Sequence, residues 1–326
     1  MKRVIKIILL VVIFAAVLGG AGFAYLYFRS PAAAPPRVVN VEMTPERIER
    51  GRYIFMSLGD CDGCHSEHDY SKLGGPVKAE RRGVGQVMPL KDLPGRIVAA
   101  NITPDAQTGI GSWTDGEKIR AIREGISRDG HMLFPLMPYA NYRYMSDEDV
   151  ESLVAYLNSM TPVRNELPKT EIAFPVSMFV KGVPRPVEGK VASVRAADGD
   201  RYGEYLVTIA NCEECHTPMV RGQADTSMRF AGGRVFATPF GTVLSANITP
   251  DMDTGIGKWD FTRFHDRVES YRQYHATFTP DAGPDKFTLM PWHAYAGLSD
   301  RDLMAIFGYI KGRAPIVHKV ETHPGS

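Results

Sequence analysis

The chain contains an internal repeat. Landmarks of the first half recur in the same order in the second half, and the offset between copies changes only from 146 residues at Asn101 to 153 residues at Met137. The matched landmarks are Gly51-Arg-Tyr-Ile54 with Gly203-Glu-Tyr-Leu206, Asn101-Ile-Thr-Pro-Asp105 with Asn247-Ile-Thr-Pro-Asp251, Thr108-Gly-Ile-Gly111 with Thr254-Gly-Ile-Gly257, Trp113 with Trp259, Met137-Pro138 with Met290-Pro291, and Ser146-Asp147 with Ser299-Asp300. A chain of 326 residues with this pattern is expected to fold as two similar domains.

All four cysteines lie within the repeat, as Cys61-Asp-Gly-Cys64-His65 and Cys212-Glu-Glu-Cys215-His216. The spacing C-x-x-C-H is the attachment signature of c-type haem. Two thiols three residues apart on a helical turn can reach the two vinyl groups of one porphyrin edge, and the adjacent histidine can bind the iron. The motifs therefore predict two covalently bound haem c groups, held by Cys61 and Cys64 in one half and Cys212 and Cys215 in the other. His65 and His216 are the predicted proximal iron ligands.

Other uses of paired cysteines remain as alternatives. A redox-active C-x-x-C is expected in a thioredoxin-like βαβ setting, which the sequence lacks. A shared zinc site would need pairs much closer than the 151 residues that separate Cys61 from Cys212, and it would leave both histidines unexplained. A structural disulfide within each C-x-x-C is the third alternative.

The repeat also selects candidates for the sixth iron ligand. Met137 lies 72 residues after His65, and Met290 lies 74 residues after His216; both precede a proline and an aromatic residue. Met137 and Met290 are the predicted axial ligands, and the alternative is that they fill gaps in the core. Histidine–methionine ligation gives iron a raised reduction potential that suits electron transfer.

Methionines and histidines without a counterpart in the other half are predicted to have structural rather than ligand roles. Met88-Pro89 has no counterpart in the second half, and Met132, Met145 and Met304 are predicted to pack in the core. Trp113 and Trp259 recur, and they either line a haem pocket or pack in the core. Seven histidines have no counterpart and are expected at the surface or in the core: His68, His131, His265, His275, His293, His318 and His323.

The local patterns predict helices. Thr44-Pro45 is a helix start, Thr114 with Glu117 forms a capping box, and Ser146 and Ser299 begin the last helix of each half. Apolar residues follow at helical spacing, as Val150, Leu153, Val154 and Leu157 in one half and Leu303, Ile306, Phe307 and Ile310 in the other. Strand-like alternation is scarce. The predicted fold is mostly α, with long loops in both halves.

An apolar segment of 22 residues, Ile7–Phe28, follows Lys2, Arg3 and Lys6. It is long enough to cross a bilayer as a helix, with its cationic end in the cytoplasm. The alternative is a signal peptide cleaved near Gly20-Ala21-Gly22, although the segment exceeds the usual apolar length. The expectation is a single-pass protein of the bacterial inner membrane with a cytoplasmic N-terminus and haem domains in the periplasm.

These observations divide the chain. The predicted parts are 1–29 (cytoplasmic end and anchor or signal peptide), 30–43 (Pro/Ala spacer), 44–160 (first haem domain), 161–200 (Pro-rich connector), 201–313 (second haem domain) and 314–326 (tail). The formal charge of +1 falls to −2 without the three N-terminal cations, and this balance gives no support for nucleic-acid binding.

The shared motifs resemble those of the membrane-associated multihaem cytochrome c subunits of bacterial periplasmic dehydrogenases that oxidise alcohols, aldehydes, gluconate or nicotinate. The resemblance covers roughly residues 44–160 and 200–312, and it implies two tandem class I-like cytochrome c domains. Two departures stand out. Such relatives often have three haem domains, whereas this chain has two C-x-x-C-H motifs, and many have a C-terminal anchor, whereas the anchor predicted here is N-terminal. The second half here also carries an insertion around Tyr271–Lys286.

The resulting prediction is an electron-transfer protein of the respiratory chain. It would accept electrons from a periplasmic dehydrogenase and pass them to quinone, another cytochrome or a terminal oxidase, without a catalytic site of its own. The alternative is a dihaem redox enzyme of the peroxidase or thiosulfate dehydrogenase type, which would need an open iron position and acid–base groups beside it.

Overall fold

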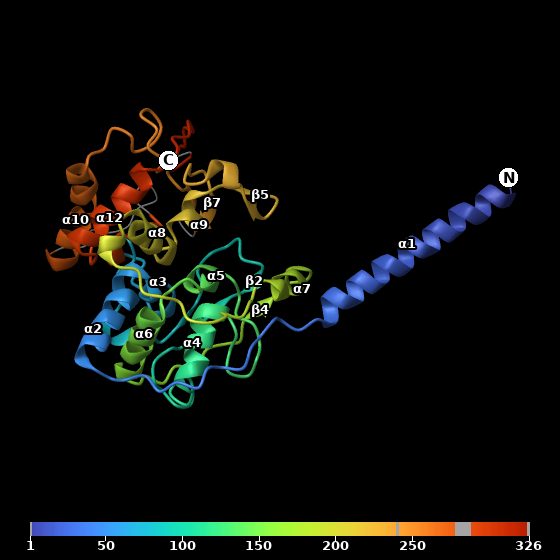
Figure 1. The fold of residues 1–326 in the computed structure, drawn as a ribbon, viewed down its shortest axis with the longest axis horizontal. Helices are drawn as coiled ribbons and strands as arrows, with labels where there is room; N and C mark the ends of the chain where they lie inside the picture. The colour runs from blue at the N-terminus through green and yellow to red at the C-terminus, as the bar shows by residue number, and fades with distance from the viewer. Residues whose placement is uncertain (1, 239–240, 278–287, 325–326) are drawn as a thin grey trace.

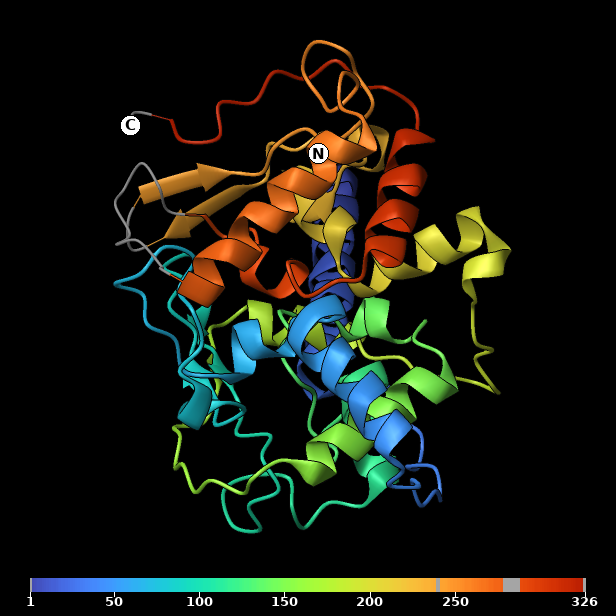
Figure 2. The same cartoon turned by 90° about the vertical axis from the view of Figure 1, so that its left-hand side faces the viewer.

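The computed structural model describes residues 2–238, 241–277 and 288–324. A long helix, α1 (Lys2–Phe28), extends away from a mostly helical body, as Figure 1 shows. The body has two stacked halves, with residues of the first half below and those of the second half above in Figure 2. The prediction of a mostly helical chain with an N-terminal apolar helix is confirmed.

The two halves contain corresponding helices. The first half contains α2 (Pro45–Tyr53), the π-helix η1 (Ile54–Leu58), α3 (Cys61–His65), η2 (Ala79–Arg81), α4 (Asp115–Glu124), α5 (Tyr139–Tyr142) and α6 (Asp147–Ser159). The second half contains α8 (Asp200–Ile209), α9 (Cys212–His216), η5 (Thr226–Met228), α10 (Phe261–Thr277), α11 (Trp292–Tyr295) and α12 (Asp300–Lys311). The connector carries α7 (Val176–Phe179), η3 (Val180–Gly182) and η4 (Ala196–Asp198). The predicted insertion around Tyr271–Lys286 lies partly in α10, and residues 278–287 lie outside the described part of the chain.

The strands are short and form four antiparallel pairs. The pairs are β1 (Gln86–Val87) with β3 (Val98–Ala99), β2 (Gly95–Arg96) with β4 (Glu171–Ile172), β5 (Met219–Val220) with β6 (Gln223–Ala224), and β7 (Val235–Thr238) with β8 (Gly241–Leu244). The β2–β4 pair joins the first half to the connector.

The helices begin where the sequence predicts. The Thr44 side chain caps α2, and Thr114 and Glu117 form both hydrogen bonds of the capping box at α4. The hydroxyls of Ser146 and Ser299 accept hydrogen bonds from Asp149 and Asp302 at the starts of α6 and α12. The apolar faces of the two last helices are buried, except that Phe307 is half-buried. These local predictions are confirmed.

Each half is built on a close helix crossing. α2 packs against α6, and α8 packs against α12. Both crossings occur at a repeated glycine. A Cβ atom on Gly51 would lie 1.9 Å from the Ser152 carbonyl oxygen, and one on Gly203 would lie 2.5 Å from that of Ala305. The glycines therefore recur because the two backbones touch there.

The first half contains one more residue than the second between the crossing and the cysteines. Seven residues separate Tyr53 from Cys61, whereas six separate Tyr205 from Cys212. The structure accommodates the extra residue in η1, a π-helical turn that directly follows α2. π-turns are the usual way to insert a residue into a helix, and they often lie beside functional sites.

Corresponding residues of the two halves make equivalent contacts across the interface between the halves. Tyr53 of α2 donates a hydrogen bond to Asp302 of α12 at 2.6 Å, and Tyr205 of α8 donates one to Asp149 of α6 at 2.5 Å. Position for position, these are the same two partners with the halves interchanged. These paired contacts relate the two halves by an approximate twofold symmetry at this part of their interface. Buried residues of both halves form one continuous apolar core.

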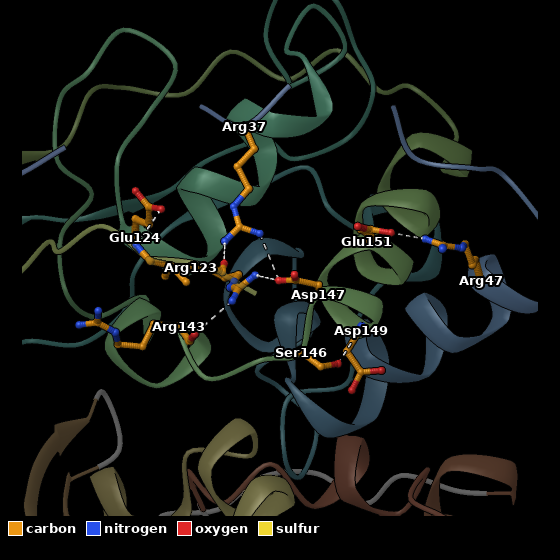
Figure 3. A network of polar contacts seen from close by, with 11 residues as sticks. Arg37, Arg47, Arg123, Glu124, Arg143, Ser146, Asp147, Asp149 and Glu151 are labelled. Atoms are coloured by element: carbon orange, nitrogen blue, oxygen red, sulfur yellow. Dashed lines mark hydrogen bonds and ion pairs between the residues drawn. The ribbon is translucent and has the colours of Figure 1, made fainter. Parts of the chain in front are cut away.

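A polar network holds the spacer and the connector against the first half (Figure 3). Arg123, whose side chain is 1% exposed, and Arg37 of the spacer both contact Asp147, at 2.6 and 3.3 Å. Arg37 also donates to the Gly189 carbonyl of the connector, and the Val187 amide donates to Glu124. These contacts attach the segments on either side of the first half to its surface.

Candidate functional site

The cysteines and histidines of both C-x-x-C-H motifs lie on single helical turns, α3 and α9. Each turn begins after a residue in the left-handed conformation, Asp60 with φ 44° and Asn211 with φ 60°. Aspartate and asparagine tolerate this conformation best among residues with side chains. The sharp entry turns the chain so that both thiols of each motif lie on the same short helix.

Both histidines are held in the same way. The Nδ1 atom of His65 lies 2.8 Å from the Ala100 carbonyl oxygen, and Nδ1 of His216 lies 2.7 Å from that of Ala246. A carbonyl oxygen can only accept a hydrogen bond, so each Nδ1 carries the proton and each Nε2 keeps its free electron pair. Burial lowers the pKa of both imidazoles. Two neutral, oriented imidazoles with a free Nε2 are what an iron atom requires.

The repeated Asn-Ile-Thr-Pro-Asp loop places these carbonyls. Ala100 and Ala246 directly precede the loops, and Asn101 and Asn247 fix them by side-chain hydrogen bonds to the chain two residues later. In both halves the asparagine amide group also donates to the threonine seven residues later and to a carbonyl of the segment after the last helix. The threonine within the loop donates to the asparagine oxygen, and the aspartate accepts a hydrogen bond from the amide of the later threonine. From the sequence these segments stand out only as repeat landmarks, and nothing in their local pattern indicates that they support the histidines. Their recurrence in both halves was the available signal.

Equivalent ion pairs hold the two C-x-x-C-H turns against the loops that follow. Arg82 contacts Asp62 at 2.8 Å, and Arg229 contacts Glu213 at 2.7 Å. Both acidic residues directly follow the first cysteine of their motif. Asp62 is buried, so its pairing with Arg82 offsets the cost of removing a carboxylate from water.

The thiols do not fit the alternative uses of paired cysteines. The four cysteines are free, with no disulfide among them. Burial raises the pKa of Cys64 and of Cys212 to about 12, whereas the reactive cysteine of a redox dithiol has a lowered pKa. Within the described residues, no three histidine, cysteine or acidic side chains gather as a metal site. The arrangement favours covalent attachment of a cofactor over a redox dithiol or a zinc site.

The two predicted methionine ligands lie in loops of the same conformation. Met137 and Met290 are both half-buried against the core. The residue two positions after each methionine donates its amide to the methionine carbonyl, at 2.8 Å in both halves. The following prolines have similar backbone angles, with φ −81° and ψ 47° at Pro138 and φ −78° and ψ 61° at Pro291.

A tyrosine ties each methionine loop to the cysteine turn of its own half. Tyr142 donates to the Gly59 carbonyl at 2.7 Å, and Tyr295 donates to the Ala210 carbonyl at 2.6 Å. Both carbonyls lie two residues before the first cysteine. Burial raises the pKa of both tyrosines, so the hydroxyls remain donors. The structure thus brings the predicted methionine, cysteine and histidine segments together in each half.

The two sites lie next to each other across the interface. Asn141, in the turn after Met137, donates a hydrogen bond to Asn211, which directly precedes Cys212. Besides burial and Asp60, Cys215 of the second half contributes to raising the pKa of Cys64. The twofold arrangement therefore brings the cysteine turns of both halves toward the same interface.

The remaining candidates have structural surroundings. Trp113 and Trp259 are half-buried against the core. His68 binds the Asp62 carbonyl, His293 binds the Leu73 carbonyl, and His318 binds the Ala231 carbonyl. The side chain of His275 lies outside the described part of the chain. Met145 is buried as predicted, but the prediction for Met304 was wrong, because it lies on the outer face of α12 and is 55% exposed.

The known proteins to which the chain is similar are c-type cytochromes. The chain is 30% identical over 312 residues to a dihaem cytochrome c of Cereibacter sphaeroides, covering 91% of this chain and 95% of the relative. It is 32% identical over 273 residues to the cytochrome subunit of fructose dehydrogenase from Gluconobacter japonicus, covering 81% of this chain and 52% of the subunit. It is 30% identical over 281 residues to the cytochrome c subunit of the quinone alcohol dehydrogenase of Gluconobacter oxydans, covering 81% of this chain and 54% of the subunit. No protein-family model matches the chain.

These relatives are haem proteins whose class implies electron transfer. The chain belongs to the family of c-type cytochromes that includes this dihaem cytochrome and the cytochrome c subunits of the alcohol and fructose dehydrogenases. It spans about half the length of those two dehydrogenase subunits.

Proposed function

We propose that the chain is a membrane-anchored periplasmic dihaem cytochrome c. It accepts electrons from a periplasmic dehydrogenase and passes them to quinone, another cytochrome or a terminal oxidase. The observation that carries the proposal is the matched pair of histidines, each with Nδ1 held by a backbone carbonyl and Nε2 free to bind iron.

In this proposal the side chains of each half have separate roles. Cys61 and Cys64 would hold one haem through thioether bonds, and Cys212 and Cys215 would hold the other. His65 and Met137 would bind the first iron, and His216 and Met290 would bind the second. When bound, the haems supply one-electron cycling between ferrous and ferric iron. The chain itself binds, orients and buries the two groups.

The dehydrogenase partner is inferred from the relatives. Several of them are cytochrome subunits of alcohol, fructose or gluconate dehydrogenases. The different substrates of these dehydrogenases show that the cytochrome subunit does not define the substrate. We therefore propose a dehydrogenase donor without assigning its substrate.

Membrane attachment is inferred from α1. It is apolar enough to cross a bilayer by length and composition, and none of its residues is buried against the body. A signal peptide would pass the same test. Contacts between its C-terminal end and the connector favour retention, because Arg29 and Tyr27 are hydrogen-bonded to residues of that segment.

The experiment that tests the proposal is a haem count with a redox titration on the purified protein. Pyridine haemochrome absorbance should give two haems per chain, and Cys64→Ala and Cys215→Ala should each remove one. Reduced protein that binds carbon monoxide at one iron would contradict the electron-carrier function and favour the peroxidase-type enzyme.

A second experiment tests the partner. Mild-detergent extraction and mass spectrometry of the haem-stained native band should identify a dehydrogenase.

A further inference from the structure

The connector between the two halves carries an apolar segment, residues 173–184, with Lys181 as its one charged residue. Phe174 and Phe179 are 64% and 56% exposed. Among the described residues outside α1, no other phenylalanine is so exposed. Two exposed phenylalanines five residues apart make this segment a candidate contact surface for an apolar partner.

This segment lies against the C-terminal end of α1. Arg29 donates hydrogen bonds to the carbonyls of Met178 and Phe179, at 3.2 and 3.0 Å, and Lys181 donates one to the Tyr27 carbonyl at 2.7 Å. The Phe174 ring meets the Phe23 ring edge-on, with 6.4 Å between centroids. Figure 1 shows α7 between the body and α1.

The geometry of α1 sets the level of these rings relative to a bilayer. A helix of 27 residues is about 40 Å long, whereas the hydrocarbon core is about 30 Å thick. The end of the helix therefore reaches the headgroup region. Phe23 lies five residues before that end, about 7 Å deeper along the axis, and Phe174 lies beside it. Lys181 and Arg29 lie at the end itself, where cations meet lipid phosphates.

We propose that residues 173–184 form a second membrane contact, in which Phe174 and Phe179 enter the outer-leaflet interface of the bilayer that α1 crosses. The proposal rests on the proposed membrane anchor. The β2–β4 pair and the hydrogen bond from the Ala173 amide to the Pro94 carbonyl fix the segment to the first half. One anchor alone would let the body rotate, whereas two contacts hold the haem domains in one orientation above the membrane.

The test measures the depth of a nitroxide spin label on the full-length protein in phosphatidylethanolamine–phosphatidylglycerol vesicles. In the haem-loaded protein the native cysteines are consumed, so Phe179→Cys introduces a single labelling site. Val235→Cys, in β7, is the matched control because Val235 is 57% exposed. The quantity measured at each position is the ratio of the label's accessibility to oxygen to its accessibility to a water-soluble nickel complex. This ratio should be severalfold higher at position 179 than at position 235. Equal accessibility ratios at the two positions would overturn the proposal.

Two further readouts separate this failure from failure of the anchor or of haem attachment. Intact mass reports whether α1 is retained, and more than one label per chain reports unattached haem. A retained α1 with an aqueous label at position 179 would contradict the second contact alone. In oriented bilayers, F174S/F179S should lose the linear dichroism of the haem bands that Val235→Ser retains. Unchanged dichroism in the double variant would contradict the orienting role.

Discussion

The histidines of the two motifs are oriented by backbone carbonyls rather than by side chains. A carbonyl oxygen can only accept, so in the neutral imidazole the hydrogen bond holds the proton at Nδ1 and leaves Nε2 available. A hydrogen-bonded imidazole is also a stronger electron donor to a metal. The two Asn-Ile-Thr-Pro-Asp loops, which fix the positions of the Ala100 and Ala246 carbonyls, are therefore part of the proposed cofactor site.

Replacing one of the proposed methionine ligands should open one iron. We expect ferrous Met137→Ala to bind one carbon monoxide per chain and the reduction potential of that haem to fall, because a weaker or absent sixth ligand favours ferric iron. Carbon monoxide difference spectra and a potentiometric titration measure the two effects. Met88→Ala is the control, because Met88 also precedes a proline and is half-buried. Identical behaviour of the two variants would contradict ligation by Met137.

The buried contact between Arg123 and Asp147 should make stability depend on pH. Burial raises the pKa of Asp147, but the hydrogen bond and charge of Arg123 hold this pKa below its ordinary value. The stabilisation is therefore complete above about pH 5 and is lost as pH falls through the folded-state pKa, below about 4. Asp147→Asn should cost about 3 kcal/mol at pH 7, because it leaves Arg123 buried without its counter-charge.

Urea unfolding of the wild type and Asp147→Asn at pH 7 and pH 3.5 measures this effect. The difference between the two proteins should shrink at the lower pH. Glu166→Gln is the control, since the Glu166 carboxylate pairs with Arg164 while 72% exposed. A constant difference between wild type and Asp147→Asn across this range would refute the assignment.

At the scale of elements, the repeated glycines determine how closely the helices cross. Gly203→Ala should destabilise the second half by about 1–3 kcal/mol, because its Cβ would overlap the Ala305 carbonyl in α12. Gly308→Ala is the matched control, since Gly308 lies within α12 with nothing within 4 Å of the added Cβ. The control should stabilise by up to about 1 kcal/mol through helix propensity alone. Denaturant unfolding of both variants distinguishes the outcomes, and equal effects would contradict the close crossing.

The sequence predicted the elements better than their arrangement. The starts of α2, α4, α6 and α12 follow from capping residues, which act within one helical turn. The left-handed residues Asp60 and Asn211 carried no such pattern. Met304 was assigned to the core, although the helical spacing of Leu303, Ile306 and Ile310 already leaves it off the buried face of α12.

A count of residues shows where the two halves differ in length, but it does not predict the π-helical turn η1. The first half has one extra residue between the conserved tyrosine position of the repeat and the first cysteine, and η1 absorbs it without shifting the cysteine turn. An alignment of the two halves shows the extra residue. Only the structure shows that it enters the helix rather than a loop, because both solutions satisfy the same spacing.

At the scale of the whole molecule, the repeat behaves as a dimer within one chain. Each half contributes one tyrosine that donates a hydrogen bond to an aspartate in the first turn of the other half's last helix. The aspartates are 7% and 4% exposed, and each also binds its own half, Asp149 through Arg50 and Asp302 through Tyr202. These paired contacts connect the helix crossings of both halves, so we expect the halves to unfold together.

Removing the two interface hydroxyls should separate the halves. Burial raises the pKa of Tyr53 and Tyr205, so both remain donors to a buried carboxylate over the working pH range. Hydrogen bonds to charged groups contribute about 1.5–3 kcal/mol each. Y53F/Y205F should therefore lower the unfolding midpoint and replace one cooperative transition by two, followed in parallel by haem absorbance and circular dichroism. Tyr144→Phe, at a side chain that is 60% exposed, should retain the single transition. A single unshifted transition in the double variant would mean that apolar packing alone joins the halves.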